Sequence, residues 1–473
     1  MFTWDELLAV AGVQPTVGEA PKQFPGAAID SRQAQPGELF VAMRGAETDG
    51  HRFIGAAVQA GAAAILCAAP AAEATERGIP QLVVADPLAA LQRLAHAHLL
   101  RQPHTRVIGV AGSNGKTSVK DAIATLLSQI APTLKTAGNL NTETGLPLTL
   151  LKLNPEHSFA VLEMGAQRVG EVEMLCRIAP PQIGVVTTIG PEHLEFFGSM
   201  ANVERAEGEI VEALPPDGIA ILNADMPAVH RMAQRTSARA ITFGRMSDAD
   251  VRASEISGET LTGRAFTLTH KDEQAPVQLH IPGEHAVSTA LAAAAVALAC
   301  GMSLPQVAAG LGEVRPAKRR GEIKPGVHGA TLIDDSYNAN RQSALAALDT
   351  LAGAHLPMGA RRWLIFGDML ELGEYAAEEH AAVGRAAVGV VDELVIIGDE
   401  TRATYAAALA AGIAPEQVHY FAAPLADAER MQQTRLAAAA YASERLRPGD
   451  LALIKGSLGA GMDVIVTALS ADE

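Results

Sequence analysis

Residues 107–118 read VIGVAGSNGKTS. The β-branched run Arg106–Val110 predicts a strand, the glycines that follow it predict a loop, and the residues from Ser118 to about Ile130 have the pattern of a helix. Glycines let the backbone approach phosphate oxygens, and the loop N–H groups and the helix N-terminus complement negative charge. We therefore expect a strand, loop and helix that bind the phosphates of a nucleoside triphosphate.

Two side chains complete this predicted phosphate loop. Lys116 is expected to reach the β- and γ-phosphates, and the Thr117 hydroxyl is expected to bind Mg²⁺. The strict pattern has a glycine at the position of Val110, so the loop is a variant, and a glycine-rich turn before a helix is the alternative interpretation. Kinases, ATPases and ligases share this loop, so it does not name a reaction. The loop residues expected to bind nucleotide are Gly112, Ser113, Asn114, Gly115, Lys116, Thr117 and Ser118.

The composition limits the class of protein. A chain of 473 residues is long enough for roughly three domains of about 150 residues each. Lys and Arg number 37 and Asp and Glu number 53, so the net charge of −16 argues against a protein that coats nucleic acid or an anionic membrane. Aromatic residues make up only 4%, so stacking on single-stranded nucleic acid is poorly supported. We expect a globular protein with aliphatic cores and no nucleic-acid partner.

Cysteine usage and the apolar stretches indicate the compartment. Cys67, Cys176 and Cys300 are far apart and odd in number, which fits neither a disulfide framework nor a zinc ribbon. The sequence begins MFTWDELLAV, where a secretory signal would have a basic start. The apolar stretches near residues 61–72 and 290–302 are shorter than the roughly 20 residues that span a bilayer. The prediction is a cytoplasmic monomer without membrane insertion.

Short apolar strands alternate with helical patterns along the whole chain, which predicts the α/β class. Asp86-Pro87 interrupts the first alternation, and Pro316 with the basic residues 318–320 interrupts the second. The central segment is expected to form a P-loop mononucleotide-binding domain with a mostly parallel sheet and an antiparallel patch at 265–281, and the last segment a Rossmann-like domain. The three expected α/β domains are residues 1–85, 86–314 and 315–473.

Longer motifs resemble one known family. GSNGKTS at 112–118, GNLNTETGLPLTLL at 138–151, LEMGA at 162–166 and GPEHLEFFGS at 190–199 resemble, in this order and spacing, the central domain of the Mur ligases. The resemblance extends over nearly the whole chain. It implies ATP-dependent ligation of an amino acid or peptide to a bacterial cell-wall precursor, with activation of a carboxylate as an acyl phosphate.

The resemblance implies a metal site beside the phosphate loop. Glu163 ends a predicted parallel strand and His193 follows another, at the sheet edge where ligands bind in open α/β folds. Together with Thr117, these two residues are expected to hold Mg²⁺ and, with Lys116, to be catalytic. A surface glutamate and a structural loop histidine are the alternative interpretations.

Glu207 and Arg320 complete the expected catalytic set. Glu207 aligns with a lysine that several Mur ligases carbamylate, and we interpret it as a direct source of the negative charge that carbamylation creates. An exposed helical glutamate is the alternative. Arg320 is expected to stabilise the transferring phosphoryl group from the third domain.

The outer segments resemble the branch of the family that adds D-alanyl-D-alanine to UDP-N-acetylmuramoyl-tripeptide. PGELFVAMRG at 36–45 is similar to its sugar-nucleotide domain, IDDSYNAN at 333–340 to its adenosine segment, and residues 366–380 and 454–462 to its third-domain motifs. The implied cofactors are ATP and Mg²⁺, and the implied partners are the tripeptide nucleotide and the dipeptide. Adenosine is expected at Asp335, Asn338 and Asn340. The two substrates are expected at Ser31, Arg32, Asn139, Asn141, Thr142, Asp368 and Lys455.

Three positions depart from this pattern. Ala286 stands where an asparagine is usual near adenine, Arg319 replaces a glycine before Arg320, and Leu458 replaces an arginine. A sibling ligase that adds a diamino acid is disfavoured because the chain has no DNPR segment, and a folylpolyglutamate synthase because the N-terminal segment is present. A P-loop phosphotransferase, a nucleotide-binding module and a degenerate homologue stay open as alternatives.

Overall fold

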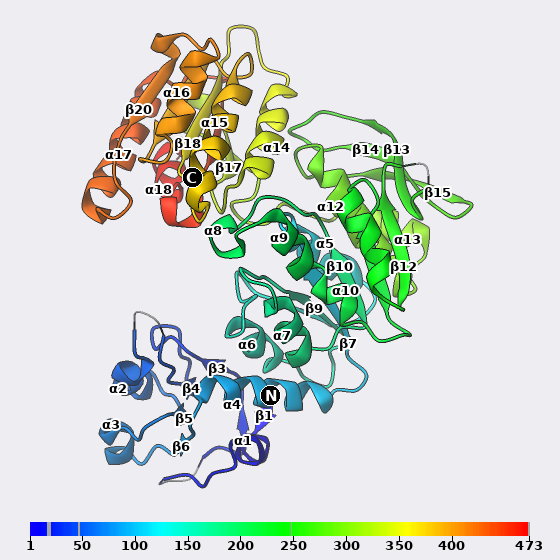
Figure 1. Ribbon diagram of the computed structural model, residues 1–473, viewed down its shortest axis with the longest axis vertical. Coiled ribbons are helices and arrows are strands. Elements are labelled where there is room, and N and C mark those ends of the chain that lie inside the picture. Colours follow the sequence, from blue (N-terminus) through cyan, green and yellow to red (C-terminus); the bar gives the residue numbers. More distant parts are fainter. Residues whose placement is uncertain (17–19, 46–47, 247, 472–473) are drawn as a thin grey trace.

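The computed structural model describes residues 1–16, 20–45, 48–246 and 248–471. Figure 1 shows three lobes in chain order, with the N-terminal lobe (blue) at the bottom, the central lobe (cyan to green) in the middle and the C-terminal lobe (yellow to red) at the top. The α/β class and the arrangement in three lobes are confirmed. The domain boundaries stay a prediction.

The N-terminal lobe is built on a parallel sheet with the order β3-β4-β5-β6. Its strands are β3 (Ala27–Ala28), β4 (Leu39–Val41), β5 (Ala64–Cys67) and β6 (Gln81–Val83). The lobe also contains the antiparallel pair β1 (Phe2–Thr3) and β2 (Gln23–Phe24), with α1 (Trp4–Ala11), η1 (Gly50–Phe53), α2 (Ile54–Gln59) and α3 (Ala72–Glu76).

The central lobe has a sheet with the order β15-β14-β13-β12-β11-β10-β7-β9-β8. It is parallel from β8 to β13 and antiparallel from β13 to β15, as the sequence predicts. Its strands are β7 (Arg106–Ala111), β8 (Thr133–Lys135), β9 (Phe159–Glu163), β10 (Ile183–Val186), β11 (Ile219–Asn223), β12 (Arg239–Gly244), β13 (Val251–Ser257), β14 (Ala265–His270) and β15 (Glu273–Gln278). Its helices are α5 (Lys116–Leu127), α6 (Gly145–Leu150), α7 (Glu171–Ile178), α8 (Leu194–Phe197), α9 (Met200–Glu207), α10 (Glu209–Glu212), α11 (Pro227–His230), η2 (Arg231–Arg235), α12 (His285–Ala299) and α13 (Leu304–Leu311).

The C-terminal lobe has a sheet with the order β16-β17-β21-β18-β19-β20, in which only the pair β16-β17 of the described strands is antiparallel. Its strands are β16 (Glu322–Pro325), β17 (Thr331–Asp335), β18 (Arg362–Gly367), β19 (Glu393–Ile397), β20 (Val418–Phe421) and β21 (Leu451–Lys455). Its helices are η3 (Val327–Gly329), α14 (Arg341–Ala352), η4 (Gly373–Tyr375), α15 (Ala376–Ala387), α16 (Arg402–Ala410), η5 (Pro415–Gln417), α17 (Ala428–Arg445), η6 (Leu458–Ala460) and α18 (Asp463–Leu469).

Helix α12 shows how an alanine-rich segment forms a core. Residues 289–297 are all buried, and the helix packs against α5 and against β11, β12 and β13. Alanine has the highest helix propensity and lets neighbouring elements approach closely. In the part of the chain that the structure describes, no helix is both long and apolar enough to cross a membrane.

Helix α4 (Pro87–Leu100) joins the first two lobes. Asp86 caps it by accepting a hydrogen bond from Ala89 N at 3.0 Å, and Pro87 occupies its first turn, where its missing N–H is not needed. One hydrophobic core runs from β4 and β5 through Leu91 and Leu94 of α4 to β7 and β9. The C-terminal lobe has separate hydrophobic cores. The N-terminal and central lobes are therefore packed as one apolar body.

Candidate active site

The loop between β7 and α5 has the shape that the glycine pattern predicts. Gly112 has a φ of +120°, and a Cβ at this position would lie 2.2 Å from Thr187 Oγ1, so only glycine fits. Gly115 has a φ of +81° and stands at the N-cap of α5, directly before Lys116. The two glycines thus place the loop backbone at the N-terminus of a helix, which is a favourable position for phosphate.

Residues after β10 hold this loop in place. The Thr187 hydroxyl donates to Asn114 O at 2.6 Å, and the Thr188 hydroxyl accepts from Asn114 N at 2.9 Å. Ser113 Oγ accepts from Gly190 N at 2.9 Å. The two threonines belong to no motif, and their position after a predicted strand end is the only local signal for them.

Lys116 lies among buried carboxylates. Its Nζ is 2.6 Å from Gly112 O and 3.2 Å from Glu192 Oε2, and Glu207 Oε2 accepts from Gly112 N at 2.5 Å. Burial alone would lower the pKa of Lys116, but the neighbouring carboxylates outweigh it and raise that pKa; they belong to Glu192, Glu207 and Glu163. Burial raises the pKa of Glu207 to about 7, although Lys116 opposes this shift. Three carboxylates, those of Glu192, Glu207 and Glu163, thus lie around this lysine.

Glu163 occupies the position expected of a metal ligand. It is buried at the end of β9, and its Oε1 accepts from Asn141 Nδ2 at 2.8 Å. Its Oε2 makes no hydrogen bond within the described residues, and Lys120 Nζ lies 3.8 Å from it. A buried carboxylate oxygen without a partner is costly, and such an oxygen is a ligand that Mg²⁺ prefers. Thr117 and Glu163 line the same pocket, so the residues present fit Mg²⁺.

His193 is held by two carboxylates instead of facing that pocket. Its Nδ1 hydrogen-bonds to Glu371 of the C-terminal lobe, and its Nε2 lies 3.4 Å from Glu192 Oε1. Burial alone would lower the pKa of His193, but these two partners outweigh it and raise the pKa to about 9. Among the described residues, no three His, Cys, Asp or Glu side chains lie close enough together to form a metal centre by themselves.

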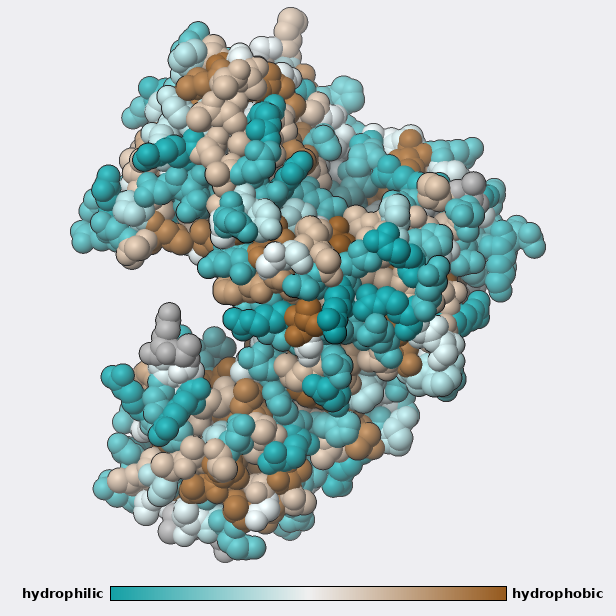
Figure 2. All heavy atoms as spheres, viewed as in Figure 1, coloured by the Kyte–Doolittle hydropathy of each residue, from teal (hydrophilic) through white to brown (hydrophobic). Residues whose placement is uncertain are grey.

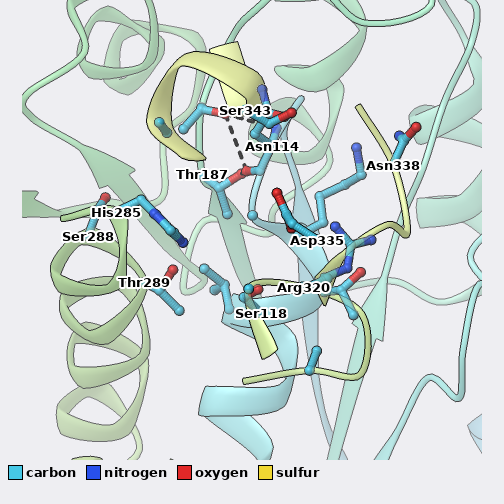
Figure 3. A pocket seen from close by; sticks show the side chains of 18 of the residues that line it. Asn114, Ser118, Thr187, His285, Ser288, Thr289, Arg320, Asp335, Asn338 and Ser343 are labelled. Carbon is cyan, nitrogen blue, oxygen red and sulfur yellow. Dashed lines mark hydrogen bonds between the residues drawn. The ribbon is translucent and has the colours of Figure 1, made fainter. Parts of the chain in front are cut away.

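A pocket lies between the central and C-terminal lobes (Figure 3). His285 and Thr289 of α12 lie on one side of it, and Arg320, Asp335 and Asn338 lie on the other. Desolvation by the surrounding atoms of the pocket lowers the pKa of His285. The predicted residues that line the pocket are Ser113, Asn114, Gly115, Lys116, Thr117, Ser118, Glu163, Arg320, Asp335, Asn338, Asn340 and Lys455. The pocket therefore brings together the phosphate loop and the expected adenosine segment, which are more than 200 residues apart in sequence.

Asn114 of the loop bonds directly to the C-terminal lobe. Asn340 Nδ2 donates to Asn114 Oδ1 at 2.8 Å, and Asn114 Nδ2 donates to Gln342 Oε1 at 2.9 Å. Asn340 also caps α14, where its Oδ1 accepts from Ser343 N at 2.9 Å. The same asparagine thus caps a helix and contacts the phosphate loop.

Lys455 lies beside the expected adenosine segment. Its Nζ is 2.5 Å from Asp335 Oδ2 and donates to Asn338 O at 3.0 Å. The Arg320 guanidinium lies 4.2 Å from the centre of the Tyr337 ring, a cation–π contact that holds it at the pocket. Lys455 and Arg320 thus place two cationic side chains in the lining of the pocket.

The three unusual residues have different surroundings. Arg319 has a φ of +63°, a conformation natural for the glycine it replaces, and its guanidinium donates to Ser336 O at 2.8 Å and lies 3.3 Å from Asp463. Ala286 is fully buried in α12, and it is the neighbouring His285 that lines the pocket. Leu458 is 47% exposed on η6.

The remaining predicted residues do not line this pocket. Asp368 is buried and accepts from Thr401 N at 3.0 Å, and burial raises its pKa to about 6. Arg32 forms a 2.7 Å ion pair with Asp30 in the N-terminal lobe, and Figure 2 shows an open gap between that lobe and the C-terminal lobe. The predicted residues outside the pocket lining are Gly112, His193, Glu207, Ser31, Arg32, Asn139, Asn141, Thr142 and Asp368.

Three family models match successive parts of the chain. They are described as the Mur ligase family catalytic domain (residues 24–99), the Mur ligase middle domain (110–297) and the Mur ligase glutamate ligase domain (319–458). The UDP-N-acetylmuramoyl-tripeptide–D-alanyl-D-alanine ligase of Mycobacterium tuberculosis is 38% identical over 98% of this chain and 96% of its own length. The chain belongs to the Mur ligase family. It is an enzyme of the ligase class.

Solved structures support the same conclusion for this Mur ligase. A crystal structure of MurF from Acinetobacter baumannii is 30% identical, covers 98% of both chains and has a TM-score of 0.84. MurF ligase from Thermotoga maritima, solved in complex with ADP, is 25% identical over 94% of this chain and 96% of its own, with a TM-score of 0.77. The three-lobed fold seen here is that of the family.

Proposed function

We propose that this Mur ligase joins D-alanyl-D-alanine to UDP-N-acetylmuramoyl-tripeptide while it cleaves ATP to ADP and phosphate. The observation that carries this proposal is the match over nearly the full length to relatives named for that reaction. A phosphotransferase that shared only the phosphate loop would not match in the outer lobes. The N-terminal lobe would bind the sugar nucleotide, the central lobe ATP and the C-terminal lobe the dipeptide.

The chemistry consists of two displacements. The terminal carboxylate of the tripeptide attacks the γ-phosphorus of ATP and ADP leaves, which forms an acyl phosphate. The dipeptide amine then attacks the acyl carbon, phosphate leaves and the nitrogen loses a proton to form the amide. The substrates are anions, so Lys116 is proposed to bind the β- and γ-phosphates and Arg320 to stabilise the transferring phosphoryl group. No serine or cysteine nucleophile is needed.

Mg²⁺ is part of the proposal. Thr117 and Glu163 would hold it, together with His193 once its Nε2 is released from Glu192, and when bound it would neutralise phosphate charge and polarise the γ-phosphoryl group. The Oε2 of Glu163, which accepts no hydrogen bond from the described residues, supports this assignment. Glu207 would add negative charge to the same cluster, which its burial and its bond to Gly112 N support.

The remaining roles are proposed from the family pattern and the pocket. The loop residues 112–118 would surround the phosphates. Asp335, Asn338 and Asn340 would bind adenosine, and their position in the lining of the pocket supports this assignment. Ser31, Arg32, Asn139, Asn141, Thr142, Asp368 and Lys455 would contact the two other substrates. The proposal also includes a cytoplasmic location, a monomer, and domains at 1–85, 86–314 and 315–473.

One assay tests the reaction. Purified protein is incubated with ATP, Mg²⁺, D-alanyl-D-alanine and UDP-muramoyl-tripeptides that differ in the third residue, and ADP, phosphate and the amide are measured. We expect ADP and phosphate only when both other substrates are present, with the amide detected by mass spectrometry. Efficient use of a diamino acid with a dipeptide nucleotide, or transfer of phosphate to a different acceptor without amide formation, would contradict the proposal.

A further inference from the structure

The segment that joins the central and C-terminal lobes carries Arg320. Residues 312–321 lie between the end of α13 and the start of β16 and form neither a helix nor a strand. Arg320 nevertheless lines the pocket, and its guanidinium lies over the ring of Tyr337 (Figure 3). A segment without regular structure does not hold a long side chain in one place by itself. Other contacts must therefore fix the end of this segment.

The neighbouring Arg319 provides such contacts. Its Nε donates to Ser336 Oγ at 3.0 Å, and its Nη2 donates to Ser336 O at 2.8 Å. The same Nη2 lies 3.3 Å from Asp463 at the start of α18, and the Arg319 side chain is only 18% exposed. Because a guanidinium is planar and rigid, paired bonds of this kind fix its direction as well as its position. Arg319 thus ties the segment to two places in the C-terminal lobe.

The residue that Arg319 binds is itself held firmly. Ser336 is fully buried, and its hydroxyl donates to Asp334 Oδ1 at 2.5 Å. Asp334 is buried in β17, and its other oxygen accepts from Lys324 Nζ at 2.7 Å. A main-chain bond runs parallel to the side-chain contact, since Tyr337 N donates to Arg319 O at 3.2 Å. The anchor point therefore keeps its own bonds whether or not Arg319 is present.

The backbone of Arg319 supports an anchoring role. Its φ of +63° lies in the left-handed region that residues other than glycine rarely adopt, and the family usually has a glycine there. Such a conformation persists only where surrounding contacts hold it. Arg319 does not line the pocket, whereas Arg320 does, so the two guanidiniums have separate surroundings. One arginine contacts the lobe and the next one faces the nucleotide pocket.

We propose that Arg319 is a positioning residue for Arg320. It ties the end of the joining segment to Ser336, which holds the Arg320 guanidinium on the Tyr337 ring at the pocket. A charged group that is already in place stabilises a transferring phosphoryl group better than one that must first be ordered. This inference rests on the proposed contact of Arg320 with the transferring phosphoryl group.

Nucleotide titrations test the inference. Arg319→Gly removes the guanidinium and leaves a residue that adopts this φ without strain. Dissociation constants for ADP and for the non-hydrolysable analogue β,γ-imido-ATP are measured by isothermal titration calorimetry at one Mg²⁺ concentration. We expect R319G to bind the analogue about 3- to 10-fold more weakly than the wild type, a change in the range of coupled neighbouring residues. ADP has no γ-phosphoryl group, and Ser336 keeps its bond to Asp334, so ADP binding should change less than about 2-fold.

A double-mutant cycle separates positioning from a structural role. In an Arg320→Ala background there is no guanidinium to position, so adding R319G should change the dissociation constant of the analogue less than about 2-fold. Arg319→Lys keeps the charge but not the paired bonds to Ser336, and it should show the same selective loss as R319G. Lys318→Ala is the matched control, because Lys318 is an exposed cation of the same segment, and it should bind both nucleotides as the wild type does.

Three results would overturn the inference. They are an unchanged affinity of R319G and R319K for the analogue, an equal loss for ADP and the analogue, and an equal effect of R319G with and without Arg320. The R320A variant alone tests the proposed function. If R320A binds both nucleotides as the wild type does, the proposed role of Arg320 fails and the inference fails with it. If R320A loses affinity for the analogue and R319G does not, the inference alone fails.

Discussion

The two joints between the lobes are built differently. The N-terminal and central lobes share one hydrophobic core that passes through α4. Around the pocket between them, the central and C-terminal lobes meet through polar side chains, with Asn114 on Asn340 and Gln342, and His193 on Glu371. Separating two apolar surfaces exposes them to water and costs free energy. Polar groups that separate can form hydrogen bonds to water instead, so their separation costs less. We infer that the first joint supplies stability and the second responds to ligands.

The largest effect is expected at the apolar joint. Leu94 is fully buried in α4, so Leu94→Ala should lower the free energy of unfolding by about 2–5 kcal/mol, through lost burial and the cavity left behind. The measurement is urea unfolding followed by circular dichroism. Leu100→Ala is the matched control, because this leucine of the same helix is 64% exposed. Similar losses in the two variants would contradict a stabilising apolar joint.

The next effect concerns the C-terminal lobe alone. His380 is fully buried, its Nε2 accepts from Met369 N at 2.9 Å, and burial lowers its pKa from 6.5 to about 4. The unfolded chain binds a proton near pH 6.5 and the folded chain only near pH 4. The contribution of His380 to the free energy of unfolding is therefore fully present above pH 6.5. Roughly 3 kcal/mol is lost as the pH falls to 4.

The variant His380→Gln isolates this contribution. Glutamine cannot titrate, so the difference in unfolding free energy between the wild type and H380Q should shift by that amount across the interval from pH 6.5 to pH 4. The measurement is urea unfolding at a series of pH values. A constant difference between the two proteins would show that His380 does not titrate as its burial requires.

A smaller effect is expected at the carboxylate cluster. If Glu207 supplies charge to the metal site, Glu207→Ala should lower ligation activity about 10- to 100-fold, as loss of a residue that supports metal ligands does. Glu207→Lys should recover activity only when bicarbonate is supplied, which activity assays with and without bicarbonate would show. Glu212→Ala, at a half-exposed glutamate nearby, is the control. Unchanged activity in E207A would rule out the role.

The smallest effect is expected at the polar joint. Gln342→Ala removes one neutral hydrogen bond to Asn114, so ATP should bind about 2- to 10-fold more weakly, while the unfolding free energy changes little. Calorimetric titration and urea unfolding measure the two quantities. Gln433→Ala, at an exposed glutamine of the same lobe, should change neither. A large decrease in the unfolding free energy of Q342A would contradict the inference that the polar joint contributes little to stability.

Much of the fold follows from local patterns. The strands expected near 159–163, 183–187 and 219–223 are β9, β10 and β11, because buried parallel strands are nearly continuous aliphatic runs. Strand β12 is not identified in the sequence, since Arg239 and Thr242 interrupt its apolar residues.

In the site, the glycines, Lys116 and Thr117 are found by their spacing. Glu371 is not, because its partner His193 is 178 residues away.

The sequence by itself determined the elements whose signals are close together in the chain: the strand, the glycine loop and the helix, together with the family pattern. The tertiary structure determined which charged side chains contact one another and which contact the backbone. It places Glu192 on Lys116 and Glu207 on Gly112 N. The free energy of a carboxylate depends on its burial and on its distances to other charges. Both quantities are properties of the packed chain, so no local motif could specify them.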